Sequence, residues 1–196
     1  VLPSVLIRIL DSFLAGFSDL YVAVLGVYYK LQTFIYMPAN GIVQGMRPII
    51  GYNYGAGEYK RVRSTIRYSL ISAAAIMLIG TLLALFLPEQ IFALFEADTD
   101  LMQAGVSALR VVCLGFLVSS VGVIYSGTFE ALGNGRDSLI ISLLRQFVIT
   151  IPLSFILSRF LGPLGIWIAF PTGELCAAVI AFFLLKSYKK GAFTPF

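Results

Sequence analysis

Long apolar runs separated by short polar stretches make up most of the chain. A membrane helix needs roughly 20 mostly apolar residues, and six segments approach that length. They are Val1–Phe17, Leu20–Ile50, Thr65–Leu87, Leu101–Leu132, Leu139–Leu161 and Leu164–Leu185. Continuous runs favour helices, since the strands of a membrane barrel alternate over about ten residues. The pattern predicts an all-α, polytopic transmembrane bundle of six helices, with a short first helix, in one domain spanning residues 1–196.

Composition indicates that the chain is surrounded by a bilayer rather than by water. Hydrophobic residues make up 59% of the chain, charged residues 12%, and the mean hydropathy is +0.91. Soluble domains average about 45–50% apolar and about 25% charged residues. The chain has no histidine, which excludes histidine-based metal sites, Ser-His triads and imidazole relays. The sequence therefore predicts no enzyme and no metal or cofactor site. The net charge of +4 forms no stripe that would bind nucleic acid.

Charged residues are distributed unequally among the connections. Cations follow the second, fourth and sixth segments, whereas acidic residues occupy the first and third connections. The cations are Lys60, Arg61, Arg63, Arg67, Arg136, Lys186, Lys189 and Lys190, and the acids are Asp11, Asp19, Glu89, Glu96, Asp98 and Asp100. Only Arg159 departs from this pattern. By the positive-inside rule, the basic connections and both termini are predicted to be cytoplasmic.

Helix-breaking residues interrupt the second segment. At about 1.5 Å per residue, Leu20–Ile50 exceeds the roughly 30 Å hydrocarbon core, so it must tilt, bend or break. Pro38 and Pro48 remove backbone donors and can kink the helix. Gly41 and Gly45 form a G-x-x-x-G pair, and small residues let membrane helices approach closely. The pattern predicts a bent helix whose glycines serve close packing, and it is also compatible with a moving helix that lines a cavity.

Three blocks of sequence resemble the multidrug and toxic compound extrusion (MATE) family of transporters. The first is "KLQTFIYMPANGIVQGMRPIIGYNYGAGEYKRVR" at residues 30–63. The second, "FEALGNGRDSLIISLLRQFVITIPL" at residues 129–153, is similar to a helix end, short turn and following helix of that family. The third is "LGPLGIWIAFPTGE" at residues 161–174. The resemblance is to the C-terminal lobe of the family, and its structural motif falls on Pro38, Gly41, Gly45, Pro48, Gly55 and Arg145.

The resemblance implies a transporter of the bacterial plasma membrane. Members of the family export cationic drugs or other organic compounds by alternating access in exchange for H⁺ or Na⁺, and they have two homologous six-helix lobes. This chain has the segments of one lobe, so a second six-helix lobe or a second copy is an expected partner. Membrane lipid, small organic cations and the coupling ion are the others. The carboxylate that sodium-coupled members carry midway along the fourth helix of this lobe is absent from residues 111–126, so that ion site is not carried over.

Charged residues within the apolar segments are candidates for the substrate or ion pathway. Lys30 and Glu174 each lie about ten residues into their segments, at similar depths of about 15 Å at helical rise. Arg110 is nearly as deep. Each unpaired charge would cost roughly 2.5–3.5 kcal/mol at a helix centre. We therefore predict that Lys30 and Glu174 face the bundle interior and approach each other or a shared polar cavity, either as a structural ion pair or as a titratable functional pair.

Further candidates lie near the predicted cytoplasmic turn at residues 133–137. Glu130 and Arg145 flank this turn, and the prediction is either that they clamp a helix hairpin at the inner face or that a buried Glu130 carries protons. Tyr36, in the interrupted second segment, is a candidate for binding flat cations through cation–π contact. Gln44 in the same segment is a further pathway candidate.

Two alternatives to an exporter are left open by the sequence. A lipid-linked oligosaccharide flippase of the same superfamily would need a strongly cationic central cavity that grips a diphosphate. Lys30 and Arg110 are the cations available for it. A truncated membrane fragment without transport activity would fit the short first segment.

Overall fold

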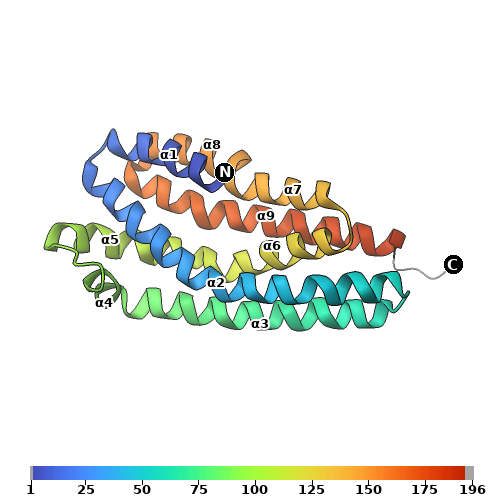
Figure 1. Ribbon diagram of the computed structural model, residues 1–196. Coiled ribbons are helices and arrows are strands. Elements are labelled where there is room, and N and C mark those ends of the chain that lie inside the picture. Colours follow the sequence, from blue (N-terminus) through green and yellow to red (C-terminus); the bar gives the residue numbers. More distant parts are fainter. Residues whose placement is uncertain (1, 193–196) are drawn as a thin grey trace.

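Helices account for the regular structure of the chain. The computed structural model describes residues 2–192, and within that range it contains helices and no strand. The helices are α1 (Leu2–Ala15), α2 (Asp19–Gly55), α3 (Tyr59–Phe86), α4 (Pro88–Ala93), α5 (Thr99–Val112), α6 (Leu114–Ala131), α7 (Gly135–Leu143), the π-helix η1 (Leu144–Val148), α8 (Thr150–Leu161) and α9 (Pro163–Ala192). They form an elongated bundle (Figure 1). The all-α prediction is confirmed.

Each of the six predicted segments corresponds to one helix or to a series of consecutive helices in the structure. The predicted segment at residues 101–132 is divided into α5 and α6 at Cys113. Cys113 keeps right-handed helical dihedrals, and the hydroxyl of Thr81 in α3 lies 3.2 Å from its carbonyl oxygen. The fifth segment corresponds to α7, η1 and α8, and the short α4 was not predicted. The interruption at Cys113 is therefore a local break that a neighbouring helix stabilises, not a loss of the helix.

The α2–α3 connection is shorter than the predicted turn at residues 55–63. Helix α2 continues through Gly55, and α3 begins at Tyr59, so only three residues lie between them. Gly57 takes φ +73°, a left-handed conformation that glycine adopts without steric cost. As a consequence, Lys60, Arg61 and Arg63 lie in the first turns of α3 rather than in a loop.

Within residues 2–192, four helical segments are long and apolar enough to cross a membrane. They are Tyr59–Phe86, Leu114–Ala131, Gly135–Leu161 and Pro163–Tyr188, and the second of them, α6, is the most enclosed. Helix α2 is outside this group. It has 37 residues, about 55 Å at helical rise, but carries Lys30, Asn40, Gln44 and Arg47 along its length. The four segments correspond to the third, fourth, fifth and sixth of the predicted apolar segments.

Helix α2 bends midway along its length (Figure 1) and contains both Pro38 and Pro48. Its buried face includes Ala39, Val43, Met46 and Ile50, spaced at helical intervals. The predicted close packing of Gly41 and Gly45 is wrong within this lobe, because a Cβ added to either would meet nothing within 4 Å. In the contact between α2 and α6, the closely packed glycine is Gly127 of α6. A Cβ there would lie 2.6 Å from a methyl carbon of Val43 and 2.9 Å from Cε of Met46.

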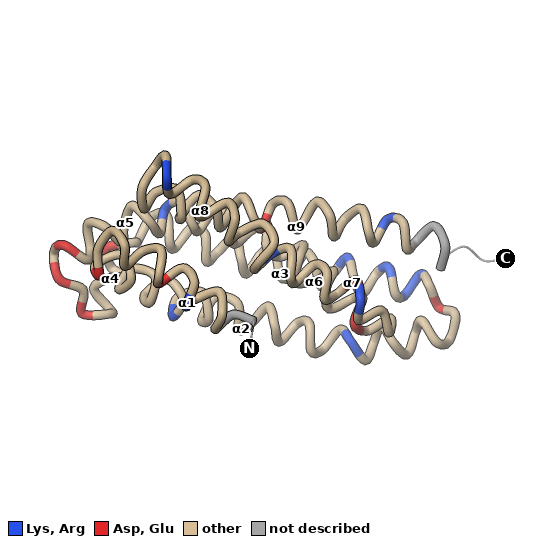
Figure 2. The backbone as a smooth tube through the Cα atoms, turned by 90° about the horizontal axis from the view of Figure 1, so that it is seen from above, with Lys and Arg blue, Asp and Glu red and all other residues tan. Residues whose placement is uncertain are grey.

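Opposite charges gather at the two ends of the bundle (Figure 2). The α2–α3 turn, the α6–α7 turn and the C-terminal end of α9 share one end, as predicted for the three basic connections (Figure 1). We call this the basic end, and it carries Lys60, Arg61, Arg63, Arg136 and Lys186. We call the other the acidic end. It carries Glu89, Glu96, Asp98 and Asp100 around α4 and the start of α5. The side chains of Lys189 and Lys190 lie outside the described side chains.

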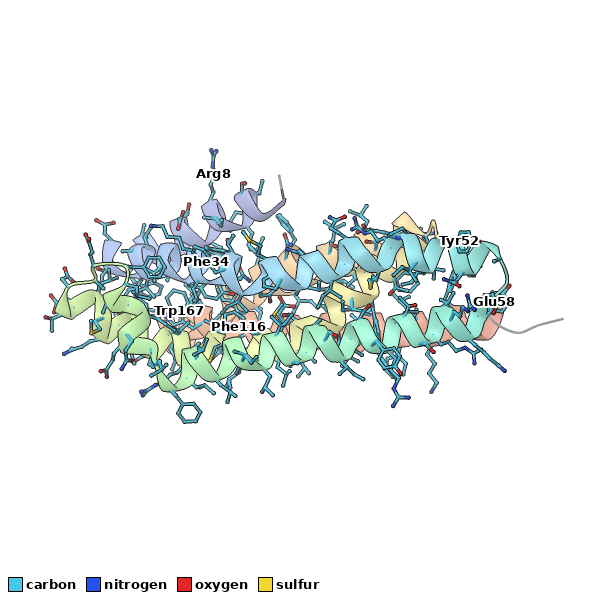
Figure 3. The ribbon with its side chains drawn as sticks, turned by 60° about the horizontal axis from the view of Figure 1, so that its bottom comes forward. Arg8, Phe34, Tyr52, Glu58, Phe116 and Trp167 are labelled. Carbon is cyan, nitrogen blue, oxygen red and sulfur yellow. The ribbon has the colours of Figure 1, made fainter. Side chains whose placement is uncertain are left out.

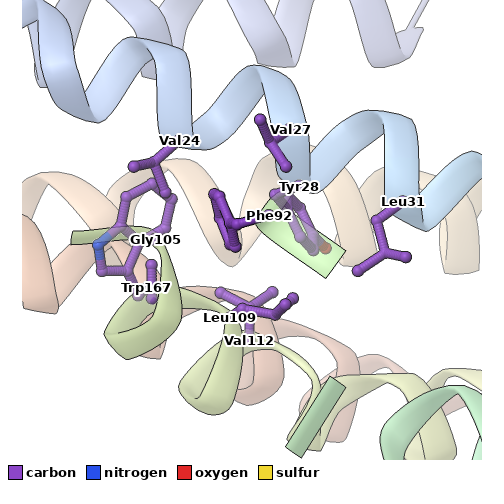
Figure 4. Close-up of a pocket in the computed structure, with 10 residues that line it drawn as sticks. Val24, Val27, Tyr28, Leu31, Phe92, Gly105, Leu109, Val112 and Trp167 are labelled. Carbon is purple, nitrogen blue, oxygen red and sulfur yellow. The ribbon is translucent and has the colours of Figure 1, made fainter. Parts of the chain in front are cut away.

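A small apolar pocket at the acidic end belongs to the core rather than to a site (Figure 4). Its volume is only about 10 Å³, which is at most one water molecule. Phe92 of α4 packs against Gly105 of α5 so closely that a Cβ on Gly105 would lie 2.1 Å from the Phe92 ring. Trp167 of α9 also lines the pocket. Figure 3 shows Trp167 and Phe116 between the helices. Arg8, in contrast, points away from the bundle. Helix α4 therefore covers this end of the hydrophobic core.

Candidate functional site

A cavity of about 420 Å³ lies among α1, α2, η1, α8 and α9. We call it the Glu174 cavity. Aromatic side chains form part of its wall, namely Tyr29, Tyr36 and Phe170. Polar side chains supply another part, namely Gln32, Thr33, Asn40, Arg145, Gln146, Thr150 and Glu174. This mixture of aromatic surface and a few convergent polar groups is typical of small-molecule sites.

Arg145 and Glu174 form an ion pair inside this cavity. Nε of Arg145 lies 3.6 Å from Oε1 of Glu174, and their side chains are only 18% and 14% exposed. Among the described residues, Oε2 of Glu174, Oε1 of Gln146 and the hydroxyl of Tyr29 are buried without a hydrogen-bonding partner, and all three residues line this cavity. Buried polar atoms are rarely left unsatisfied. The cavity is therefore suited to a bound donor, such as water or a cationic group.

The π-helix η1 positions Arg145 and Gln146. Pro152 has no N–H and cannot donate to the carbonyl of Val148 four residues earlier, which weakens regular α-helical pairing at this point. The amide of Ile149 instead donates to the carbonyl of Leu144 at 3.3 Å, and the hydroxyl of Thr150 donates to the carbonyl of Arg145 at 2.6 Å. Such π-helical turns are rare and are frequently found at functional sites.

Gly173 allows α9 to approach η1 and α8 closely. A Cβ on Gly173 would lie 2.4 Å from the hydroxyl oxygen of Thr150 and 3.5 Å from the carbonyl oxygen of Arg145. Glu174 directly follows Gly173 in the sequence. The close contact at Gly173 therefore sets the position along the axis of α9 at which the Glu174 carboxylate meets Arg145. No other residue type offers the same clearance, so Gly173 is a positioning residue of the site.

A second cavity, of about 170 Å³, adjoins the first toward the basic end. We call it the Glu130 cavity. Glu130 of α6 is paired there with Arg47 of α2, and the hydroxyl of Ser138 donates to Oε1 of Glu130 at 2.9 Å. Arg47 also donates to Oε1 of Gln44 at 3.4 Å. Tyr36, Asn40 and Arg145 line both cavities, so the two spaces share a wall.

The predicted pairing of Lys30 with Glu174 is wrong. Lys30 is exposed, and its ammonium lies 5.7 Å from the ring centroid of Phe95, in the α4–α5 connection. Glu174 is paired with Arg145 instead. The matching depths of Lys30 and Glu174 describe only position along the helix axes. The direction in which each helix faces is decided by its buried residues, which on α2 include Val24, Val27 and Tyr28.

The structure also separates the other predicted pair and places the remaining candidates. Glu130 and Arg145 do not clamp the hairpin together, because each has a different partner. Arg110 is exposed in the last turn of α5 and lines neither cavity. Gly55 ends α2 in open space. Tyr36 lies between the two cavities, and Gln44 accepts from Arg47.

Sequence reasoning missed Arg47, Gln146 and Gly173 as site residues. Arg47 lies in the interrupted second segment, and its position one turn from the exposed Gln44 offered a signal that it belongs with the polar face. Gly173 directly precedes a charged residue in an apolar run, which was a weaker signal. The described residues contain no group of three Cys, Asp or Glu side chains that could hold a metal ion.

Comparison with known proteins gives consistent matches. The model of the family MatE matches residues 2–156. The multidrug export protein MepA of Staphylococcus aureus strain MSSA476 is 28% identical over 181 residues, covering 91% of this chain and 40% of the relative. MepA of Staphylococcus haemolyticus is 26% identical over 189 residues, covering 96% and 41% respectively. The chain thus spans about two fifths of the length of these curated relatives.

Solved structures share the fold. An outward-facing multidrug resistance MATE family transporter of the MOP superfamily superposes with a TM-score of 0.90 at 22% identity, covering 96% of this chain and 43% of that one. The MATE multidrug transporter DinF-BH, solved in complex with a ligand, has a TM-score of 0.81 at 34% identity, covering 95% and 42%. In each case the bundle corresponds to less than half of the matched chain.

Proposed function

Because the chain belongs to the MatE family, we propose that it forms one lobe of an ion-coupled exporter of cationic organic compounds. The relatives that it resembles are named multidrug export proteins. They are more than twice as long as the part that this chain matches. Alternating access requires two bodies that move against each other around a site. The second body would be a further six-helix lobe, either a second copy of this chain or a different one.

The Glu174 cavity is the observation that supports export of cations. It combines one carboxylate with the aromatic walls of Tyr29, Tyr36 and Phe170. Aromatic faces attract cations, and the attraction grows when the groups are removed from water. A positively charged compound that enters the cavity would compete with Arg145 for Glu174. A proton or Na⁺ would compete for the same carboxylate, and such competition is the basis of antiport.

The Glu174 cavity does not have the charge that the flippase alternative needs. A diphosphate would have to be gripped by cations without matching carboxylates. Arg145 in the described lining is paired with Glu174, and the other two cations considered, Lys30 and Arg110, lie outside the cavity. The observations therefore favour a cationic substrate over an anionic lipid headgroup.

Neutralising Glu174 tests the proposed function. In cells that express the chain with the lobe it pairs with, Glu174→Gln should reduce resistance to cationic dyes to the level of cells without the transporter. The amide keeps the shape of the side chain but removes the charge for which the ion and the substrate compete. Growth in the presence of ethidium, together with dye accumulation, would measure the effect.

Glu89→Gln is the matched control for that experiment. Glu89 is exposed in the first turn of α4 and lines neither cavity, so its neutralisation should leave resistance unchanged. Full resistance in Glu174→Gln at equal expression would refute the proposed role of the carboxylate. An absence of efflux with the unaltered chain, alone and with a partner lobe, would favour the non-transporting alternative.

The orientation of the lobe gives a further prediction, that the basic end faces the cytoplasm. Ser64, Ser187 and Thr99 are exposed, the first two near the basic end and the third at the acidic end. In intact cells, an impermeant thiol reagent should label Thr99→Cys and should not label Ser64→Cys or Ser187→Cys. The reagent should reach the latter two after the cells are opened. Labelling of all three positions in intact cells would contradict the orientation.

A further inference from the structure

We propose that the Glu130 cavity and the Glu174 cavity together form a hydrated route along which protons reach Glu174 from the basic end, within this single lobe. This rests on the proposed function, since it supplies the route of the coupling ion and specifies that the ion is a proton. The route begins at the ion pair of Arg47 and Glu130 and ends at the ion pair of Arg145 and Glu174.

The first step of the argument is that the two cavities meet. Arg145 contributes to both linings, as do Tyr36 and Asn40 of α2. On the opposite wall, α6 presents Gly122 to the Glu130 cavity, so no side chain fills the space at that position. A Cβ on Gly122 would come within 3.9 Å of Cδ of Arg145. Arg145 therefore stands at the junction, with a carboxylate at the far side of each space.

Hydroxyl groups connect the junction to Glu130. Ser126 of α6 and Ser142 of α7 line the Glu130 cavity, with their oxygens 3.5 Å apart. The Ser126 oxygen lies 2.8 Å from that of Ser138, which donates to Glu130 at 2.9 Å. Each hydroxyl can accept one hydrogen bond and donate another. The series Ser142, Ser126, Ser138 and Glu130 is therefore a continuous hydrogen-bonded chain that can pass a proton.

The size and polarity of the spaces suit water between these groups. The Glu130 cavity has a volume of about 170 Å³, well above the roughly 10–15 Å³ that a single water molecule needs. The Glu174 cavity, of about 420 Å³, is larger. Water orders in polar cavities where it finds two to four partners, whereas apolar cavities stay dry. The amide of Asn40, the hydroxyl of Tyr36 and the unsatisfied Oε1 of Gln146 supply such partners.

The charged and titratable groups that face the route come from few elements. Glu174 of α9 faces Arg145 from η1 and the phenols of Tyr28 and Tyr36 from α2, and Tyr29 of α2 lines the same cavity. Glu130 faces Arg47 from α2. Helix α1 contributes only Leu6 and Ile7 to the lining, and α8 contributes Thr150. Among the described lining residues, no further ionisable side chain competes for the proton.

Proton transfer along this route balances without any other reactant. A proton from the solution at the basic end joins the carboxylate of Glu130, and the hydroxyls and waters each pass one proton onward. The last transfer protonates Glu174 and releases Arg145 from its ion pair. Release in the opposite direction restores the pair. Only O–H bonds form and break, and the net change is one proton moved to Glu174.

A side-specific pH jump tests the route. Membrane vesicles containing the full chain are acidified only on the side of the basic end, and infrared difference spectroscopy follows the carboxyl band that is lost in Glu174→Gln. Ser126→Val removes the hydroxyl that lies between Ser142 and Ser138 in the hydrogen-bonded series. It should slow the appearance of the Glu174 carboxyl band at least tenfold. Glu130→Gln should slow it similarly. Ser126→Thr is the matched control, because it has nearly the same volume as valine but keeps the hydroxyl, and its rate should stay within twofold of the unaltered chain.

Equal rates for Ser126→Val and Ser126→Thr would overturn the proposed route, as would the absence of a Glu174 carboxyl band. The two proposals fail separately. If Glu174→Gln abolishes efflux while the two Ser126 variants protonate equally fast, the exporter function stands and protons reach Glu174 by another path. If Glu174→Gln leaves efflux intact, the exporter assignment to this cavity fails whatever the rates are.

Discussion

Replacing Arg145 by methionine should lower the free energy of unfolding of the lobe by about 3–5 kcal/mol, since breaking a buried ion pair leaves an uncompensated charge. Glu174 would be that charge, because Arg145 is its ion-pair partner and its carboxylate is only 14% exposed. Methionine keeps the length of the arginine stem and fills irregular space, so packing changes little. Unfolding of the purified chain by titration with SDS in mixed micelles would measure the loss.

The double change Arg145→Met with Glu174→Leu should recover most of that stability, because a buried ion pair replaced by apolar residues is often neutral or stabilising. We expect the double variant to fold and to remain inactive in export, since the carboxylate for ion and substrate is gone. This combination separates structure from function. A double variant that exports dye would show that the pair serves packing alone, and one as unstable as Arg145→Met would contradict the ion-pair explanation.

Alanine at Gly165 should destabilise the lobe by about 2–3 kcal/mol, at the upper end of the usual cost of overpacking. A Cβ there would lie 2.3 Å from both the carbonyl carbon and oxygen of Leu157 and 2.7 Å from the amide nitrogen of Ser158. These are backbone atoms of α8 and cannot move as a side chain would. The α8–α9 hairpin would have to open, and with it the wall of the Glu174 cavity. The same SDS titration would show the loss.

Gly41→Ala is the control for this prediction. Gly41 is also a helical glycine, but a Cβ there meets nothing within 4 Å. Alanine is favoured over glycine within a helix by up to about 1 kcal/mol. We therefore expect unchanged or slightly higher stability for Gly41→Ala in the purified chain. Similar losses at Gly41 and Gly165 would contradict the close approach of α8 and α9.

Some features of the site were accessible to sequence reasoning and others were not. Glu174 was identified as a functional candidate because a carboxylate in an apolar run is costly and therefore informative. Depth along a helix can be counted from the sequence, and matching depth predicts Lys30 as the partner of Glu174. The direction in which a side chain points toward another helix cannot be obtained by counting residues. It depends on which residues each helix buries, and the packing of α2 leaves Lys30 exposed.

Gly41 and Gly45 show the same limit for packing. The G-x-x-x-G spacing correctly indicates a smooth face on α2, but it does not say what lies against that face. In this lobe the α2–α6 contact uses Gly127, and the glycine face of α2 remains open. The π-helix at Arg145 was also beyond prediction. Pro152 indicates a disturbance of the helix, whereas the form of that disturbance depends on Thr150 and on the approach of Gly173.

The sequence by itself determined three properties of this protein. They are the apolar surroundings that its surface requires, its all-helical class and the separation of basic from acidic connections. These follow from composition, from the length of apolar runs and from the placement of cations, which are local properties of the chain. Tertiary structure alone decided that Glu174 meets Arg145, that Glu130 meets Arg47, and that two cavities share a wall. Those outcomes depend on the rotation and approach of helices far apart in sequence, which are set by the summed packing of the whole bundle.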